Sequence, residues 1–226
     1  TERGTGEIIA DSPEIRGVLA GFGLNTDQVS DYHVYPIADN DSPRLSADRL
    51  EYTLGNVLNY GFADRETAAA LYADLTVGTN ETGEPELCFR TPRAAADFAR
   101  LALACAEVYV SPEDRYSMQL LSELLRRALD RGILTEADLS GTEPALIKRL
   151  EASALAPDWA RFCAMSRIRT AERPPEGRPW RQVPAKKRCI DPLAAGQGRA
   201  SALDPSFAAA LAAFRAAPQT AWLLGE

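Results

Sequence analysis

The sequence predicts an all-α protein, mainly helical, with a minor β element and an extended basic segment near the C-terminus. Three observations indicate this fold class. Residues able to cap a helix, followed by apolar positions at helical spacing, recur along most of the chain. Residues 81–90 are the best strand candidate, with alternating side chains behind a turn. From about residue 167 onward, Pro and Arg become frequent.

The first half is expected to contain helices that begin at caps and end at glycine. Ser12 precedes Pro13, a residue suited to the first helical position, and Gly21 or Gly23 ends that helix. Ser46 and Asp64 are the next caps. The expected elements are a helix over 12–23, a short helix or turn over 26–32, a loop over 36–43, and helices over 46–61 and 64–78.

The second half continues in the same way after the strand candidate, in which Leu87 and Phe89 alternate with Cys88 and Arg90. The expected helices cover 91–110, 111–132, 135–140, 142–153 and 205–217, with short extended pieces at Ile168 and over 187–193. We therefore expect two domains, a helical domain over 1–166 and a basic extended segment with its terminal helix over 167–226.

Composition and cysteine usage indicate a cytoplasmic protein. The hydrophobic fraction of 46% is normal for a chain that buries a core. No apolar run approaches the roughly 18 residues that span a bilayer, and no export signal precedes the first helix. The four cysteines form no CxxC pair, which fits a reducing compartment. We expect no membrane partner.

Charge is divided unevenly along the chain. Residues 167–200 carry a net +6 and residues 1–166 a net −12, within a total of −7. Within the basic segment, Lys186, Lys187 and Arg188 follow Trp180, a combination that also occurs in nucleic-acid contacts. An alternating strand with solvated bases explains the same residues. The acidic remainder would repel a phosphate chain, so nucleic acid is not the favoured partner.

The most informative stretch is "ADRLEYTL", which places Asp48 in the first turn of a helix with Arg49 and Tyr52 beside it. An acid in a first turn is favoured by the helix dipole alone. A carboxylate, a guanidinium and a phenol on one helix flank also suit a phosphate bound to a metal. The preceding loop adds acids and the single histidine; an oxygen-ligand site for Mg²⁺ or Ca²⁺ would use Asp31, His33, Asp39, Asp41 and Asp48.

The segment "PRLSADRLEYTLGN" resembles the region of the last metal ligand in the HD-domain superfamily of metal-dependent phosphohydrolases. "VYVSPEDR", "GILTEADL" and "AKKRCIDPL" are similar to an uncharacterised bacterial branch of it. The resemblance implies an HD-domain-like helical bundle. It implies that Asp48 is a metal ligand and that Arg49 and Tyr52 contact substrate phosphate. Asn56 stands where relatives often have an acid.

The resemblance also implies a divalent metal (Mn, Mg, Fe, Co or Ni) held by a His, a His-Asp doublet and a distant Asp. The metal would activate water for phosphoester hydrolysis. This chain departs from the pattern because His33 is its one histidine and is followed by Val34. A packed or hydrogen-bonded His33 is the plainer interpretation. The expectation is a phosphohydrolase portion that lacks its histidines and is inactive alone.

Two hypotheses of function therefore stay open. The first is the metal-dependent phosphohydrolase, acting on a small phosphoester or nucleotide, with Lys186, Lys187 and Arg188 leaning over the phosphate end of the site. The second is a non-catalytic helical protein that uses the same scaffold for binding or regulation. A homo-oligomer is compatible with either. Glu113, Asp114 and Arg115 at a helix start are explained by the dipole and a local ion pair.

Overall fold

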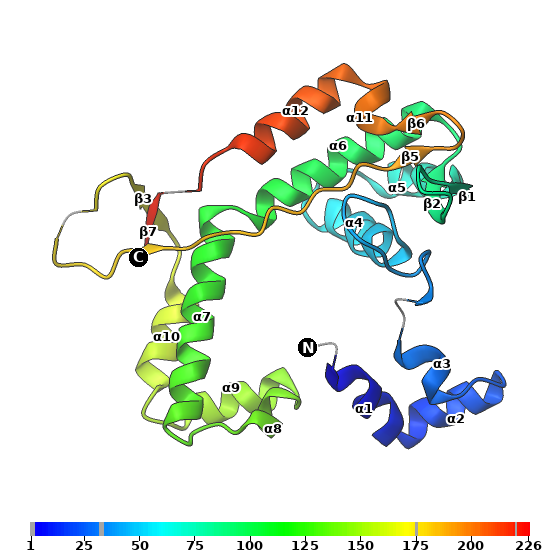
Figure 1. Ribbon diagram of the computed structural model, residues 1–226. Coiled ribbons are helices and arrows are strands. Elements are labelled where there is room, and N and C mark those ends of the chain that lie inside the picture. The colour runs from blue at the N-terminus through cyan, green and yellow to red at the C-terminus, as the bar shows by residue number, and fades with distance from the viewer. Residues whose placement is uncertain (1–2, 32–33, 175, 220) are drawn as a thin grey trace. The chain divides into compact units, whose positions relative to one another are not determined.

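The computed structural model describes residues 3–31, 34–174, 176–219 and 221–226 (Figure 1). The chain divides into two compact units. Unit 1 comprises Thr1–Cys105 and Arg188–Phe214, and unit 2 comprises Ala106–Lys187 and Arg215–Glu226. The predicted domains 1–166 and 167–226 were divided by composition, whereas these two units are divided by contacts between residues. The predicted division therefore stays a prediction.

Unit 1 combines helices with a four-stranded sheet. Its helices are α1 (Arg3–Asp11), α2 (Pro13–Gly21), α3 (Thr26–Ser30), α4 (Ala47–Asn59), α5 (Arg65–Ala73), α6 (Pro92–Tyr109), α11 (Ala200–Leu203) and α12 (Pro205–Ala216), of which α6 and α12 continue into unit 2. Its strands are β1 (Leu75–Thr79), β2 (Pro85–Phe89), β5 (Leu193–Ala194) and β6 (Gly198–Arg199).

The sheet of unit 1 has the order β1-β2-β5-β6. The hairpin β1–β2 is antiparallel, with Val77 opposite Leu87, and Figure 1 shows it beside β5 and β6. Strand β2 pairs in parallel with β5 through Phe89 and Ala194. The Phe89 ring lies 5.2 Å from that of Phe98 on α6, so helix and sheet share a buried core.

Unit 2 contains α7 (Pro112–Asp130), α8 (Glu136–Leu139), α9 (Glu143–Glu151), α10 (Ala156–Ala164), β3 (Ile168–Ala171), β4 (Arg181–Gln182) and β7 (Trp222–Gly225). Its antiparallel sheet has the order β3-β7-β4. One core cluster gathers Leu124 and Leu150 with their neighbours, and a second joins Tyr116 to Val183 and Leu223. None of the helices in the described ranges combines the length and apolar character that a bilayer crossing requires.

The predicted all-α, HD-domain-like bundle is wrong, because the described strands form sheets of four and three strands within a mixed α/β arrangement. The expected helix over 64–78 ends at Ala73, where Asp74 is the C-cap, and Leu75 begins β1. Thr76 and Val77 are β-branched and favour a strand. Strands β4 and β5 are only two residues long and pair with β7 and β2, far away in sequence, which local patterns do not reveal.

Candidate functional site

The loop before α4 folds back onto the first turn of that helix. The side-chain amide of Asn40 donates to the carbonyls of Pro36 and Leu45, both at 2.9 Å. The amides of Ala47 and Asp48 donate to Ile37 and Ala38 carbonyls at 2.8 and 3.1 Å. The loop and the start of α4 therefore form one ordered piece.

Arg49 holds this piece together from inside. Its Nη1 lies 3.1 Å from Asp39 Oδ1, 2.9 Å from Asn40 Oδ1 and 3.0 Å from Ser46 Oγ. Its Nη2 donates to the Asn40 carbonyl. The Arg49 side chain is only 16% exposed. Most of its donors thus serve the loop, and a phosphate contact by Arg49 stays a prediction.

Tyr52 lies one turn further along α4, half-buried, with charged groups on several sides. Burial raises the pKa of its phenol. Arg49 and Arg188 act in the opposite direction on that pKa, while Asp48 and Asp39 add to the rise. The phenol therefore stays protonated at neutral pH and can donate to an oxyanion. The charges that influence its pKa thus come both from α4 and from Arg188.

The segment around Arg188 is fixed to the loop before α4. The Ser42 hydroxyl donates to the Cys189 carbonyl at 2.7 Å, and the Asp191 amide donates to the Pro43 carbonyl at 2.8 Å. The Asp191 carboxylate accepts from the amide and hydroxyl of Ser201 at 2.9 and 2.5 Å. These bonds hold the segment of Arg188 to the loop before α4. The Arg188 charge can therefore influence the pKa of Tyr52, although 136 positions separate the two in the sequence.

Asp48 is exposed in the first turn of α4. Within the described ranges, no three His, Cys, Asp or Glu side chains gather in a group that could hold a metal. Asp39, another acid of the expected oxygen-ligand site, already accepts from Arg49 and from the Asn40 amide. His33 lies outside the described residues. The described residues thus supply one carboxylate of the expected metal site and do not by themselves fit a divalent metal.

A buried charge network that the sequence did not reveal supports this end of unit 1. The Glu86 carboxylate is fully buried and lies 2.6 and 2.9 Å from the two terminal nitrogens of Arg199. Arg199 also contacts Glu81 at 2.7 Å through Nε and Nη2. Burial alone would lower the pKa of Arg199, but its hydrogen bonds to the two carboxylates raise it overall.

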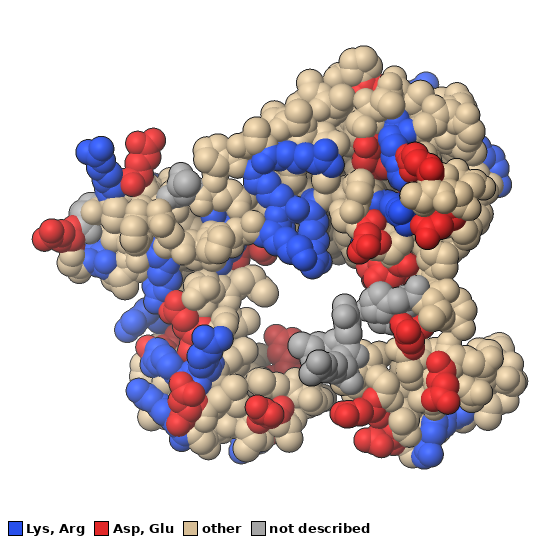
Figure 2. Space-filling view, viewed as in Figure 1, with Lys and Arg blue, Asp and Glu red and all other residues tan. Residues whose placement is uncertain are grey.

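This network ties the helix start to the sheet. Glu86 accepts from the Leu45 amide at 3.2 Å, directly before the Ser46 cap of α4. Arg44, in the loop before α4, pairs with Glu84 of the β1–β2 hairpin at 2.6 Å. Figure 2 shows acidic and basic side chains gathered over α4, β5 and β6. Rigid placement of the α4 start is the structural consequence of these pairs.

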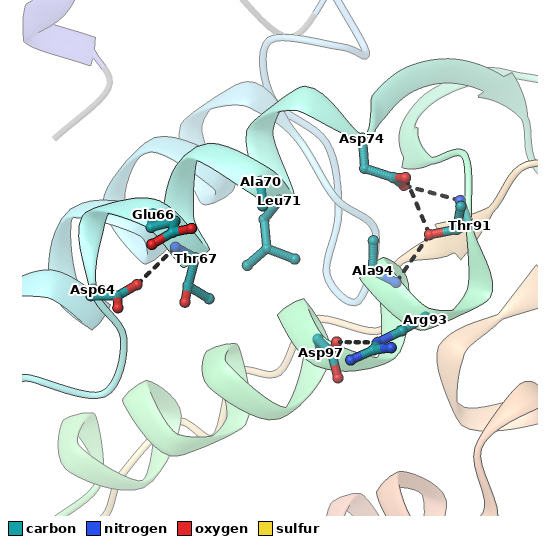
Figure 3. A pocket seen from close by; sticks show the side chains of 10 residues that line it. All are labelled: Asp64, Glu66, Thr67, Ala70, Leu71, Asp74, Thr91, Arg93, Ala94 and Asp97. Carbon is teal, nitrogen blue, oxygen red and sulfur yellow. Dashed lines mark hydrogen bonds and ion pairs between the residues drawn. The ribbon is translucent and has the colours of Figure 1, made fainter.

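Two cavities lie near these elements in unit 1. One, of about 410 Å³, is lined by α5 and α6 and contains four carboxylates and one arginine (Figure 3). Three of the carboxylates are engaged: Asp64 accepts from the Thr67 amide, Asp74 from Thr91, and Asp97 pairs with Arg93. These bonds cap or join the two helices, so a structural role accounts for this acidic cavity.

The other cavity is an apolar groove of about 630 Å³ between α4 and the β1–β2 hairpin. Leu50 and Leu54 line it from the helix, and Leu75, Val77 and Leu87 from the strands. A groove of this size and character suits a small apolar group or side chain.

The remaining predicted residues lie elsewhere. Lys187 donates to the carbonyls of Arg215 and Ala217 in unit 2. Lys186 lines a cavity with Arg115, also in unit 2. Of the three basic residues expected over the phosphate end, Arg188 belongs to unit 1, and its charge favours a lower pKa of Tyr52. Asn56 is partly buried on α4.

Comparison with known proteins gives one distant relative. No protein-family model and no solved structure matches the chain. The chain is 25% identical over 149 residues to the uncharacterised protein YdhJ of Bacillus subtilis (strain 168). The alignment covers 65% of this chain but only 44% of YdhJ, so the chain spans less than half the length of that relative. This similarity assigns neither a family nor an activity.

Proposed function

We propose that the start of α4 belongs to the substrate site of a cytoplasmic, metal-dependent phosphohydrolase that acts on a small phosphoester or nucleotide. The observation that carries the proposal is that Asp48 and Tyr52 lie one turn apart on α4. Arg188 precedes Cys189, whose carbonyl accepts from Ser42 in the loop before that helix. A neutral phenol beside a guanidinium is suited to hold a phosphate oxygen. The resemblance of "ADRLEYT" to the last-ligand segment of HD-domain enzymes supports the same assignment.

The roles of the residues follow from their surroundings. Asp48 is exposed and is thus accessible to a metal ion. Tyr52 and Arg188 would bind the substrate phosphate, the first as a hydrogen-bond donor and the second as a charge. Arg49 would act mainly as a positioning residue, because its guanidinium organises the loop. The further metal ligands would have to come from residues outside the described part of the chain.

A second candidate function is a non-catalytic binding module, and the apolar groove beside α4 is the observation that favours it. Its lining is dominated by leucine and valine side chains. A protein of this kind would bind a partner through the groove and would not need the phenol or Arg188. The two candidates therefore differ in which residues their ligands require.

Binding of a nucleoside triphosphate tests the proposal on this chain. We expect saturable binding in calorimetry that Tyr52→Phe and Arg188→Met each weaken about tenfold. Glu51→Ala, which removes an exposed carboxylate from the same helix, is the control and should bind like the wild type. Unchanged binding in both site variants would contradict the phosphate role and favour the binding module.

A further inference from the structure

Arg115, near the start of α7, is a buried arginine whose charge has no partner of opposite sign among the described residues. It is 7% exposed, and its Nη1 donates to the Val183 carbonyl at 2.6 Å. Its Nε has no hydrogen-bond partner in the described part of the chain. Arg115 therefore contacts a backbone carbonyl, and the local ion pair expected at this helix start is absent among the described residues.

Such a residue is energetically unusual. Desolvation lowers the pKa of the Arg115 guanidinium, but arginine stays charged at neutral pH all the same. A buried cation normally has a carboxylate or several hydrogen bonds to offset its desolvation. An anion bound next to Arg115 would provide that compensation.

The space for such an anion is present. Arg115 lines a cavity of about 310 Å³ in unit 2, together with Lys186, Gln119 and Asp114. Lys186 is exposed and brings a second positive charge. The cavity also lies at the N-terminal end of α7, a 19-residue helix whose dipole favours an anion there.

The remaining lining indicates a small organic molecule attached to the anion. Met118 and Pro184 provide apolar surface. Asp114 supplies a hydrogen-bond acceptor on the cavity wall. An acceptor near the two cations suits a ligand that carries hydroxyl groups as well as a negative group. The volume of about 310 Å³ has room for a sugar phosphate.

We propose that this cavity is a binding site for a small phosphate monoester, with the phosphate on Arg115 and Lys186 and its hydroxyl groups toward Asp114. The residues that line the site all belong to unit 2. It would serve as an effector site, because none of the residues assigned to phosphate hydrolysis lines it.

Calorimetric titration of the chain with ribose 5-phosphate, at constant ionic strength, tests this site. We expect a saturable binding event that is about tenfold or more weaker in Arg115→Met and several-fold weaker in Lys186→Ala. Arg126→Met on the same helix and Lys148→Ala on α9 change exposed cations outside the cavity and should leave binding unchanged. Tyr52→Phe should also leave it unchanged, which separates this site from the proposed active site.

Absence of saturable binding in the millimolar range would overturn the proposal. So would Arg115→Met binding as tightly as the wild type, or acetate binding as tightly as ribose 5-phosphate. Lys186 is exposed, so Lys186→Ala is expected to fold even where Arg115→Met does not. If Arg115→Met fails to fold, unchanged binding in Lys186→Ala would overturn the proposal by itself.

Discussion

The guanidinium of Arg199 makes two hydrogen bonds, at 2.6 and 2.9 Å, to the fully buried carboxylate of Glu86. This pair joins β6 to β2, and Glu86 also accepts from the amide of Leu45 before α4. The Glu86 carboxylate thus bonds to the start of α4 and to β6 from its own place on the β1–β2 hairpin.

Removing one member of this pair should destabilise unit 1 strongly. Arg199→Met leaves the Glu86 charge buried without its main partner, at a cost of about 3–5 kcal/mol in the free energy of unfolding. Urea unfolding measures it. Arg44→Ala, which breaks a partly exposed pair on the same hairpin, should cost much less. Equal losses in the two variants would contradict the central role of Glu86.

The Ser46 cap should matter more than an ordinary helix cap. Its hydroxyl accepts from the Arg49 amide at 3.2 Å and from Arg49 Nη1 at 3.0 Å. We expect Ser46→Ala to lower the free energy of unfolding by about 2 kcal/mol. Ser111→Ala removes a cap of α7 that accepts from the Asp114 amide at 3.1 Å, and should cost about 1 kcal/mol. A smaller loss for Ser46→Ala would show that the loop does not depend on it.

The start of α4 shows which parts of the fold were predictable. Ser46 as cap and Asp48 in the first turn follow from local sequence, and α4 begins where they indicate. The sheet did not follow, because Glu86 faces the core although a charged residue in a strand ordinarily faces water. Its partner Arg199 lies 113 residues away.

The candidate site was predictable to a similar degree. The sequence predicts Asp48, Arg49 and Tyr52 on one helix, and α4 contains all three, while their roles at a site stay predictions. That Arg49 turns inward toward Asp39 depends on the fold of the loop. That Arg188 acts on Tyr52 depends on backbone bonds between the loop and a segment near Asp191, which no local pattern encodes.

The ionisation of Tyr52 should report on its charged neighbours. Its pKa is expected above the ordinary value of 10.0, since burial is the largest influence. Arg188→Met removes a cation and should raise this pKa further, whereas Asp48→Asn removes an anion and should lower it. Tyrosinate absorbance, taken as a difference from Tyr52→Phe, measures both shifts. Identical titrations in the two variants would place these groups away from the phenol.

Acid should weaken unit 2 through Glu123. The Arg181 guanidinium, 2.7 Å from its carboxylate, lowers the pKa of Glu123. Because the folded-state pKa lies below the unfolded value near 4.5, the stabilisation is present above that pH and is lost as the pH falls through the lower folded value. Glu123→Gln should therefore lose less stability on acidification than the wild type in urea unfolding. Equal losses of stability on acidification in the wild type and in Glu123→Gln would contradict this role of Glu123.

Phosphoester hydrolysis is the most direct test of Asp48 as a metal ligand at a phosphate site. Metal content and turnover of generic phosphoesters with Mn²⁺ are measured on this chain and on the full-length protein, with Asp48→Ala and the Glu51→Ala control. We predict metal-dependent turnover in the full-length protein, lost in Asp48→Ala and kept in Glu51→Ala. Neither metal nor turnover in either form, or turnover that survives Asp48→Ala, would contradict the assignment.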